Sequence, residues 1–154
     1  MEIEKLIEVD STTLVNEVET HLLDGERVSF QFKKGWAIEN FPKEAGVYAI
    51  FRKDKLIYFG QTANLKERMG EMHRTYMHSL RKKLGRFVFK AELIGNKYSE
   101  TVERKLDELY ENEISVSFLS LALGRLEIES HLIKRHPNLM NSPSRRTTKP
   151  KPVV

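Results

Sequence analysis

The apolar positions of the chain change their spacing from one segment to the next. In residues 11–24 they lie three or four positions apart, as Leu14, Val18 and Leu22 do, which predicts a helix. In residues 28–32 they alternate with polar positions, which predicts a half-buried strand. The first expected elements are therefore a helix and a strand.

A β-hairpin is predicted next, because two apolar and aromatic runs, 46–52 and 56–60, flank the polar turn 53–55. A helix follows, with Asn64 as its N-cap. Glu67, three positions later, completes the pattern of a capping box. The chain is therefore expected to pass directly from the hairpin into a helix.

Five further elements show the same two kinds of spacing. They are a short basic helix at 78–84 ended by Gly85, a strand at 87–93, a helix at 99–111, a strand at 114–118 and a helix at 123–136. Together the elements predict an α/β fold, more strictly α+β, in which helices flank a small and mostly antiparallel sheet.

Three parts are expected along the chain. Residues 1–41 form an N-terminal extension, a helix and a strand that pack on the core, and residues 42–141 form the main domain. Residues 142–154 are rich in Ser, Pro, Thr, Lys and Arg and have no apolar period. That composition predicts a basic, disordered tail.

Composition excludes several classes of protein. With 154 residues, 40% of them hydrophobic and 31% charged, the chain is typical of one globular domain. The absence of cysteine excludes a disulfide scaffold, a zinc ribbon and a cysteine nucleophile. No apolar run reaches the roughly 18 residues of a membrane span, and the acidic N-terminal stretch does not resemble a secretory signal. We therefore expect a cytoplasmic protein with no membrane partner.

The basic residues cluster, although the net charge is only +4, from 26 basic and 22 acidic residues. One cluster is Arg81, Lys82, Lys83 and Arg86, and a second lies in the tail. Such clusters favour a polyanionic partner, but solvated surface runs show the same pattern. Charge alone leaves both interpretations open.

One carboxylate occupies a position where carboxylates are rare. The apolar arc of the last predicted helix is formed by Leu126, Ile128, Leu132 and Ile133. On a helical wheel with Leu126 at zero, Glu129 falls inside this arc, at about 300°. A buried charge needs a partner, because an unpaired one is strongly destabilising. Two interpretations remain open: an ion pair with Arg125 one turn earlier, and a functional acid or metal ligand.

Tyr48 and Tyr58 lie in otherwise apolar strands, and a buried phenol needs a hydrogen-bond partner. Whether they share a face of the sheet depends on the turn between them. A two-residue turn pairs Tyr48 with Phe59 and places the tyrosines on opposite faces. A three-residue turn at 53–55 pairs Ile50 with Tyr58 and places both on one face. Ordinary packing residues show the same spacing.

Four segments of the chain follow one another in a characteristic order. They are Gly-Val-Tyr at 46–48, Tyr-Phe-Gly at 58–60, a run from 60 that ends in Arg68, and the helical segment 126–134 with Glu129. In this order and spacing they resemble the GIY-YIG nuclease family. The resemblance covers about residues 42–141, and the closing Pro137 and Asn141 also match the family.

The resemblance implies the family's fold and a metal-dependent DNA endonuclease that hydrolyses phosphodiester bonds. It selects Glu129 as the ligand of Mg²⁺ or Mn²⁺, and a single carboxylate suffices because Mg²⁺ keeps several waters. It implies Arg68 as the group that stabilises phosphate charge, because a guanidinium is a planar fork that is always charged. It implies Tyr48 as general base and Tyr58 as an orienting group, both on one face of the sheet.

Two positions depart from the family pattern. Phe59 replaces the usual isoleucine or valine, which exchanges one apolar residue for another. The family often has a histidine or tyrosine four residues after its arginine, where this chain has Met72. His73 is one position later, about 100° around the helix, and reaches the site only if Gly70 deforms that helix. We keep His73 as a catalytic candidate. The other histidines are predicted to be surface or capping residues: His21, His78, His131 and His136.

DNA is the partner that the resemblance implies. The expected sequence-independent phosphate contacts are Lys66, Arg81, Lys82, Lys83 and Arg86. A homodimer would allow both strands to be cut. The alternative function is a non-catalytic nucleic-acid-binding module, which is expected to have lost Arg68 or Glu129, and both are present. The four-part pattern argues against a third interpretation, a structural protein with an incidental basic patch.

Overall fold

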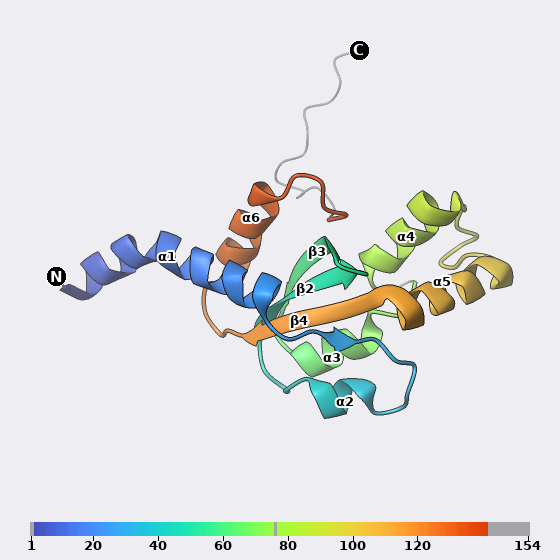
Figure 1. Cartoon of the computed structure of the whole chain (residues 1–154), viewed down its shortest axis with the longest axis horizontal. Helices are drawn as coiled ribbons and strands as arrows, with labels where there is room; N and C mark the ends of the chain where they lie inside the picture. The colour runs from blue at the N-terminus through green and yellow to red at the C-terminus, as the bar shows by residue number, and fades with distance from the viewer. Residues whose placement is uncertain (1, 76, 142–154) are drawn as a thin grey trace, which may run out of the picture.

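The computed structural model describes residues 2–75 and 77–141 (Figure 1). Its centre is an antiparallel sheet with the strand order β1-β4-β2-β3, so the predicted α+β class is confirmed. The strands are β1 (Val28–Ser29), β2 (Gly46–Arg52), β3 (Lys55–Thr62) and β4 (Ile114–Ser120). The helices are α1 (Glu2–Asp24), α2 (Trp36–Asn40), α3 (Leu65–Glu71), α4 (Ser79–Phe89), α5 (Glu100–Glu113) and α6 (Arg125–Arg135).

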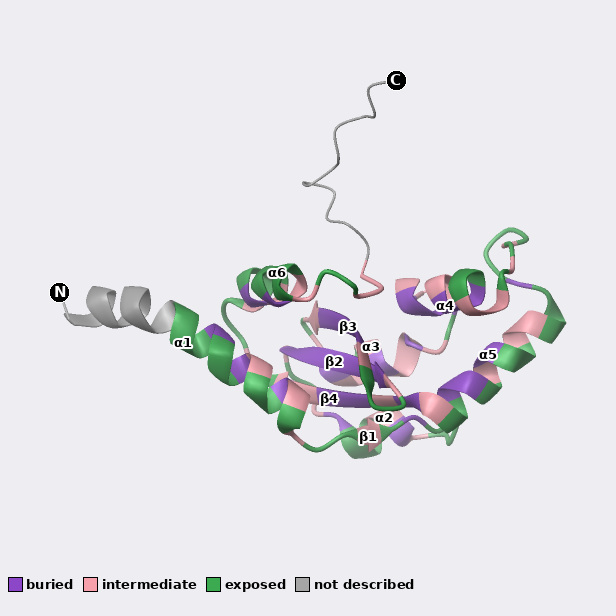
Figure 2. Cartoon of the chain, turned by 45° about the horizontal axis from the view of Figure 1, so that its top comes forward, coloured by how far each residue is buried: buried purple, intermediate pink, exposed green. Residues whose placement is uncertain are grey.

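Helices cover both faces of the sheet, and the strands between them are mostly buried (Figure 2). On one face, Val47, Ala49 and Phe51 of β2 pack against α1 and α6. On the other face, Tyr48 and Ile50, which alternate with them, pack against α3, α4 and α5. A strand covered on both sides is apolar throughout, which explains the continuous apolar run of β2. The layer under α3, α4 and α5 therefore contains the first tyrosine of interest.

The β2–β3 hairpin reaches the expected pairing by an unexpected route. Its turn contains two residues, because Arg52 pairs with Lys55, so the predicted three-residue turn is wrong. A β-bulge beside Ile50 then shifts the register by one residue, and Ile50 pairs with Tyr58. Without the bulge, the two-residue turn would place Tyr58 on the opposite face of the sheet from Tyr48, and the extra residue of the bulge returns it to the same face. As a result Tyr48 and Tyr58 lie on the same face of the sheet.

The predicted strand at 87–93 is wrong. Helix α4 continues through Gly85, the residue expected to end it. The apolar positions Leu80, Leu84 and Val88 are spaced four apart, and all three pack into the core beside α5. The helical spacing of these three residues therefore decides the structure of the segment, and the alternation of apolar residues at 87–93 does not.

Other predicted elements are present with different bounds. The first helix begins at Glu2 rather than at residue 11, and the strand expected at 28–32 is limited to Val28–Ser29. Phe30 leaves the strand and enters the core instead. The expected tail, 142–154, lies outside the described residues. Across residues 2–75 and 77–141, no helix is both long and apolar enough to cross a membrane.

Candidate active site

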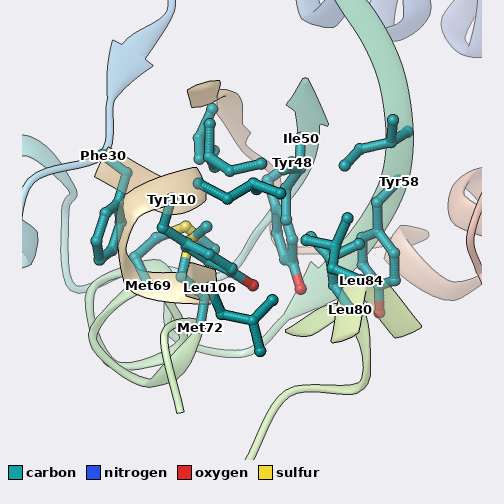
Figure 3. Packing of buried hydrophobic residues seen from close by; sticks show 14 of the residues in the cluster. Phe30, Tyr48, Ile50, Tyr58, Met69, Met72, Leu80, Leu84, Leu106 and Tyr110 are labelled. Atoms are coloured by element: carbon teal, nitrogen blue, oxygen red, sulfur yellow. The ribbon is translucent and has the colours of Figure 1, made fainter. Parts of the chain in front are cut away.

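The two tyrosines of the hairpin form a stacked pair. Their ring centroids are 6.3 Å apart, the ring planes differ by 22°, and both side chains are buried. Figure 3 shows their hydroxyl groups pointing in the same direction. Gly60 makes room for the pair, since a Cβ at that position would lie 2.2 Å from Cζ of Tyr48. The glycine that follows Tyr58 and Phe59 is therefore needed to seat the ring of Tyr48.

His78 is the hydrogen-bond partner of Tyr48, with 3.1 Å between its Nε2 and the tyrosine hydroxyl. The histidine is completely buried and also caps α4, because its Nδ1 accepts the backbone N–H of Leu80 at 3.2 Å. Burial, assisted by the charge of Arg68, lowers the pKa of His78 to about 3, so the ring is neutral. A neutral ring whose Nδ1 accepts carries its proton on Nε2. His78 therefore donates its hydrogen bond to the oxygen of Tyr48.

The environment of the tyrosines opposes their ionisation. Burial raises the pKa of the Tyr48 hydroxyl, and Tyr58 adds to the increase. Burial also raises the pKa of Tyr58, whose hydroxyl lies 3.4 Å from Oγ of Ser79. Arg68 acts in the opposite direction on both hydroxyl groups. Arg68 is thus the neighbouring charge that favours phenolate at this site.

Arg68 lies in the last turn of α3 with 28% of its side chain exposed. Its Nη1 donates to the carbonyl oxygen of Met77 at 3.1 Å and lies 3.5 Å from a carboxylate oxygen of Glu71. A guanidinium has five N–H donors, and these two contacts use only Nη1. Arg68 also interacts with the hydroxyl group of Tyr48, and its partly exposed positive charge is accessible to an anion that approaches from solvent.

Glu129 lies on α6 and is half-buried. Burial raises the pKa of its carboxyl group, and the backbone N–H of Gln61 partly opposes the increase. The ion pair with Arg125 that the wheel left open is not formed between these two described residues. Arg125 donates instead to the side-chain oxygen of Gln61 at 3.2 Å and to the carbonyl of Ala122 at 2.7 Å. Glu129 is therefore a partly desolvated carboxylate without that cation.

The buried stripe of α6 is narrower than the wheel predicted. Ile128 and Leu132 pack against the sheet, whereas Leu126, placed in the apolar arc, is 62% exposed. Although α6 covers the opposite face, it packs along the edge strand β3, and Glu129 reaches Gln61 near the end of that strand. Its charge is close enough to raise the pKa of Tyr48 and of Tyr58. The candidate site thus lies along the edge strand β3, with α3 and α4 on one face of the sheet and α6 on the other.

Asn141 holds the outer edge of β3 in place. Its side-chain oxygen accepts the backbone N–H of Phe59 at 3.1 Å, and its Nδ2 donates to the carbonyl of Phe59 at 2.6 Å. The backbone N–H of Met140 donates to the carbonyl of Ile57 at 2.8 Å. An edge strand has unpaired backbone groups, and these bonds satisfy several of them next to Tyr58.

Two of the expected site residues lie elsewhere. His73 packs against Phe30 and Phe32, at ring-centroid distances of 5.9 and 5.5 Å, and not beside the tyrosines. Arg81, expected to contact phosphate, is 2% exposed and donates to Glu103 and to a neighbouring aspartate, both at 2.8 Å. A buried arginine that two carboxylates neutralise has no free charge for DNA, so we remove Arg81 from the expected contacts.

The other expected DNA contacts lie at the surface to different extents. Arg86 is exposed, and Lys66 and Lys82 are half-buried. Lys83 is also half-buried, and its Nζ donates to the carbonyl of Met140 at 2.6 Å. Lys83 therefore anchors the segment that carries Asn141, and the other three remain candidates for phosphate contacts.

Sequence reasoning missed His78 as a site residue. It assigned this histidine to the surface or to a cap; the cap is correct, but the side chain is buried against Tyr48. Thirty residues separate the two in the sequence, and no spacing rule connects them. The available signal was the His-Ser pair at the start of a basic amphipathic helix, which indicates a cap but not its buried partner.

The residues present fit a single-carboxylate metal site. Within the described part of the chain, no three His, Asp or Glu side chains gather as metal ligands. Mg²⁺ and Mn²⁺ prefer oxygen ligands, and Mg²⁺ usually keeps several waters with only one or two protein carboxylates. Glu129 supplies such an oxygen donor, half-buried and not paired with Arg125. A hard divalent cation held through Glu129 and water is therefore chemically consistent with this site.

Comparisons with known proteins give one kind of match. No family model and no curated protein sequence matches the chain. Among solved structures, two point mutants of the GIY-YIG N-terminal endonuclease domain of UvrC from Thermotoga maritima match, each bound to its catalytic divalent cation. Each match covers 74% of this chain and 100% of the other, at 19% identity and a TM-score of 0.42. Both solved structures are GIY-YIG domains, and this is the family that the four sequence segments resemble. At this identity and TM-score the match carries no functional argument.

Proposed function

We propose that this protein is a metal-dependent DNA endonuclease that hydrolyses phosphodiester bonds. The observation that supports the proposal is the arrangement at the edge of β3. There Arg68 is partly exposed, Glu129 is not paired with Arg125, and both lie close enough to influence the stacked tyrosines electrostatically. A cation and a carboxylate that lack full partners inside a partly buried site are typical of sites that bind charged substrates.

Arg68 binds the scissile phosphate. Its exposed N–H donors match two phosphate oxygens, and its charge offsets the negative charge that develops as water attacks. Its bond to the carbonyl of Met77 fixes the direction of the guanidinium before substrate arrives. Fixed donors of this kind stabilise the transition state without reorganisation.

Tyr48 first loses its own proton to solvent water and, as the phenolate, takes the proton of the attacking water on its oxygen. Two groups favour the phenolate that this role requires: the charge of Arg68 and the N–H that His78 donates. Because the bond from His78 occupies one lone pair of the oxygen, it also directs the tyrosine's own proton away from the histidine. Tyr58, stacked on Tyr48, orients the water or the phosphate.

Glu129 holds Mg²⁺ or Mn²⁺, which when bound supplies Lewis-acid stabilisation of the phosphate and of the leaving oxygen. Lys66, Lys82 and Arg86 contact phosphates on either side of the cut without reading sequence. A homodimer would place two such sites on the two strands of a duplex. A cytoplasmic location stays a prediction.

The proposal is tested by incubating supercoiled plasmid with the purified protein and Mg²⁺, beside the Glu129→Ala variant and beside wild type in EDTA. Nicked or linear DNA is expected with wild type and Mg²⁺ alone. Linear product that forms together with nicked product, in a protein that sediments as a dimer, would support paired cutting. Retarded plasmid without any cleavage would instead support the non-catalytic binding module.

A further inference from the structure

A second recess lies beside the candidate site, between residues 30–38 and helix α3. It has a volume of about 460 Å³, within the range of roughly 300–1,000 Å³ usual for ligand pockets. Helices α2 and α3 lie next to each other at this place (Figure 1). One wall therefore comes from the N-terminal extension, to which the proposed chemistry assigns no role.

The extension lines this recess with a group of aromatic rings. Phe32 is 41% exposed, and its ring meets Phe30 edge to face at 4.7 Å and His73 at 5.5 Å. Phe30 in turn packs on Trp36, at 4.9 Å, in the buried core. The exposed ring is thus supported from behind by buried rings. A large aromatic side chain that is held in this way and faces solvent is suited to stacking with a planar ligand.

The rim of the recess is mainly basic. Four basic side chains line it, and they are Lys33, Lys34, Lys66 and Arg74. Only two acidic side chains line it, Glu67 and Glu71, and Glu71 already lies 3.5 Å from Arg68. Outside the lining, Glu39 pairs with Lys33 at 3.2 Å, so Lys34, Lys66 and Arg74 carry the basic character of the rim. An aromatic platform within an excess of cations suits a ligand that combines a flat ring with a negatively charged backbone.

The recess and the candidate site share residues. Arg68 lies within bonding distance of Glu71 and donates to the carbonyl of Met77, and both of these residues line the recess. Arg68 is therefore connected to the wall of the recess through two of the residues that line it.

We propose that this recess receives an unpaired nucleobase of the DNA strand, stacked on Phe32 with the perpendicular ring of His73 beside it, and with the adjoining phosphates on the basic rim. The proposal rests on the proposed function for its choice of DNA, but it concerns binding, which can be measured without cleavage. It gives His73 a positioning role in base stacking, and it makes the N-terminal extension part of the DNA-binding surface.

The test compares two probes: a short single-stranded oligothymidylate, and an abasic deoxyribose-phosphate oligomer of the same length. Fluorescence anisotropy in EDTA measures their dissociation constants, so no cleavage interferes. Wild type is expected to bind the thymidylate more tightly than the abasic oligomer. The Phe32→Ala change should weaken thymidylate binding about 5- to 150-fold, the range of one base–aromatic stack, with little effect on the abasic oligomer.

A second variant guards against a folding defect in Phe32→Ala. Gly70 lines the recess, and a Cβ there would meet only Ala37, at 3.9 Å, so Gly70→Leu fills the space without a clash at Cβ. Leucine also favours a helix more than glycine, which supports α3. The leucine side chain should abolish the preference for the oligothymidylate over the abasic oligomer and leave the melting temperature unchanged. Leu14→Ala, at a residue of α1 exposed to 42%, is the matched control and should bind as wild type.

The outcomes separate this proposal from the proposed function. Equal affinity of wild type for both oligomers, or unchanged binding by Gly70→Leu, would overturn the base pocket even if plasmid is cut. No affinity for either oligomer would also overturn it and would favour a peptide or another ligand in the recess. A thymidylate preference that depends on Phe32, in a protein that cuts no plasmid, would support the pocket while the endonuclease proposal failed.

Discussion

Arg68 of α3 and Arg81 of α4 both belong to polar clusters, but their surroundings are different. The side chain of Arg81 is 3% exposed and lies 2.8 Å from a carboxylate oxygen of Glu103 and another of Asp107. The side chain of Arg68 is 28% exposed, and its carboxylate neighbour, Glu71, is 3.5 Å away. The charge of Arg81 is neutralised inside the protein, whereas the charge of Arg68 is partly exposed to solvent.

The contrast indicates how a structural arginine differs from a functional one. A buried arginine is tolerated only if its charge is balanced, and its partners then leave nothing for a ligand. An arginine held by a backbone carbonyl is oriented but keeps its charge, so it can bind an anion. Glu129 resembles Arg68 in this respect, because it is partly buried and is not paired with Arg125. The predictions below test whether the incompletely paired groups carry the activity.

The largest expected effect is at Glu129. Glu129→Gln removes the charge and keeps the shape, so cleavage should fall by more than about 10²-fold while DNA binding remains. Because burial raises the pKa of this carboxyl group, its charge opposes folding at neutral pH, and the glutamine variant should melt at the same temperature or higher.

Plasmid cleavage in Mg²⁺, gel retardation and thermal melting measure these three properties. Glu127→Gln, an exposed position on the same helix, is the matched control and should keep full activity. Full Mg²⁺-dependent activity of Glu129→Gln would contradict the assignment of the metal ligand.

Substitutions of the two arginines are expected to affect different properties, the cleavage rate for Arg68 and the stability for Arg81. Arg68→Lys keeps the charge but loses the fork, so the cleavage rate should fall about 10²-fold with little change in stability. Arg81→Ala leaves two carboxylates without their partner and should cost about 3–5 kcal/mol of unfolding free energy. Its activity per folded molecule should stay near that of wild type. Urea denaturation and initial cleavage rates separate the two effects, and a lysine variant of Arg68 that cuts normally would make Arg68 a simple surface charge.

The tyrosine pair is expected to divide its roles unequally. Phenylalanine preserves the stacked packing and removes only the hydroxyl group. Tyr48→Phe should lower kcat by up to about 10²-fold if Tyr48 is the general base. Tyr58→Phe should have a smaller effect, because its hydroxyl orients rather than accepts a proton. Single-turnover cleavage compares the two variants, and a larger loss for Tyr58→Phe would exchange their roles.

The smallest expected effect is a pH dependence of stability due to His78. Its folded-state pKa is lowered to about 3, below the usual 6.5, so the unfolded chain binds a proton that the folded chain rejects between these values. The contribution of His78 is therefore fully present above pH 6.5 and is lost as the pH falls, at about 1.4 kcal/mol per pH unit.

Urea denaturation between neutral and mildly acidic pH measures that slope. His78→Asn retains a side chain able to cap α4 and cannot titrate, so the difference between the variant and wild type isolates the histidine. Identical slopes for the two proteins would show that His78 is already accessible to protons in the folded state.

Local signals in the sequence predicted several parts of the fold correctly. Asn64 caps α3 by accepting the backbone N–H of Glu67 at 3.1 Å, and Ser99 caps α5. The cap at Asn64 was expected, because a capping bond joins residues only three positions apart. The hairpin follows from two short apolar runs around a polar turn, and strand β4 follows from short-range alternation. The helical wheel singled out Glu129, and the order of the motifs selected both Glu129 and Arg68; their roles remain predictions until cleavage is measured.

Signals that depend on distant residues were misread. The strand expected at 87–93 is wrong because Leu80, Leu84 and Val88 find a core to pack against, which makes α4 longer. Arg81 was grouped with its basic neighbours because its two carboxylate partners lie on α5, far along the chain. Clustering in sequence describes charge density and does not describe which charges are neutralised.

The sequence by itself determined most of the elements and the cap of α3, because these depend on interactions within a few positions. Only the tertiary structure decided that a bulge brings Tyr48 and Tyr58 to one face and that His78 donates to Tyr48. The tertiary structure also decided that carboxylates neutralise Arg81, whereas the charge of Arg68 stays partly exposed. The physical reason is that burial and hydrogen-bond partners belong to the packed chain, in which residues thirty or more positions apart become neighbours.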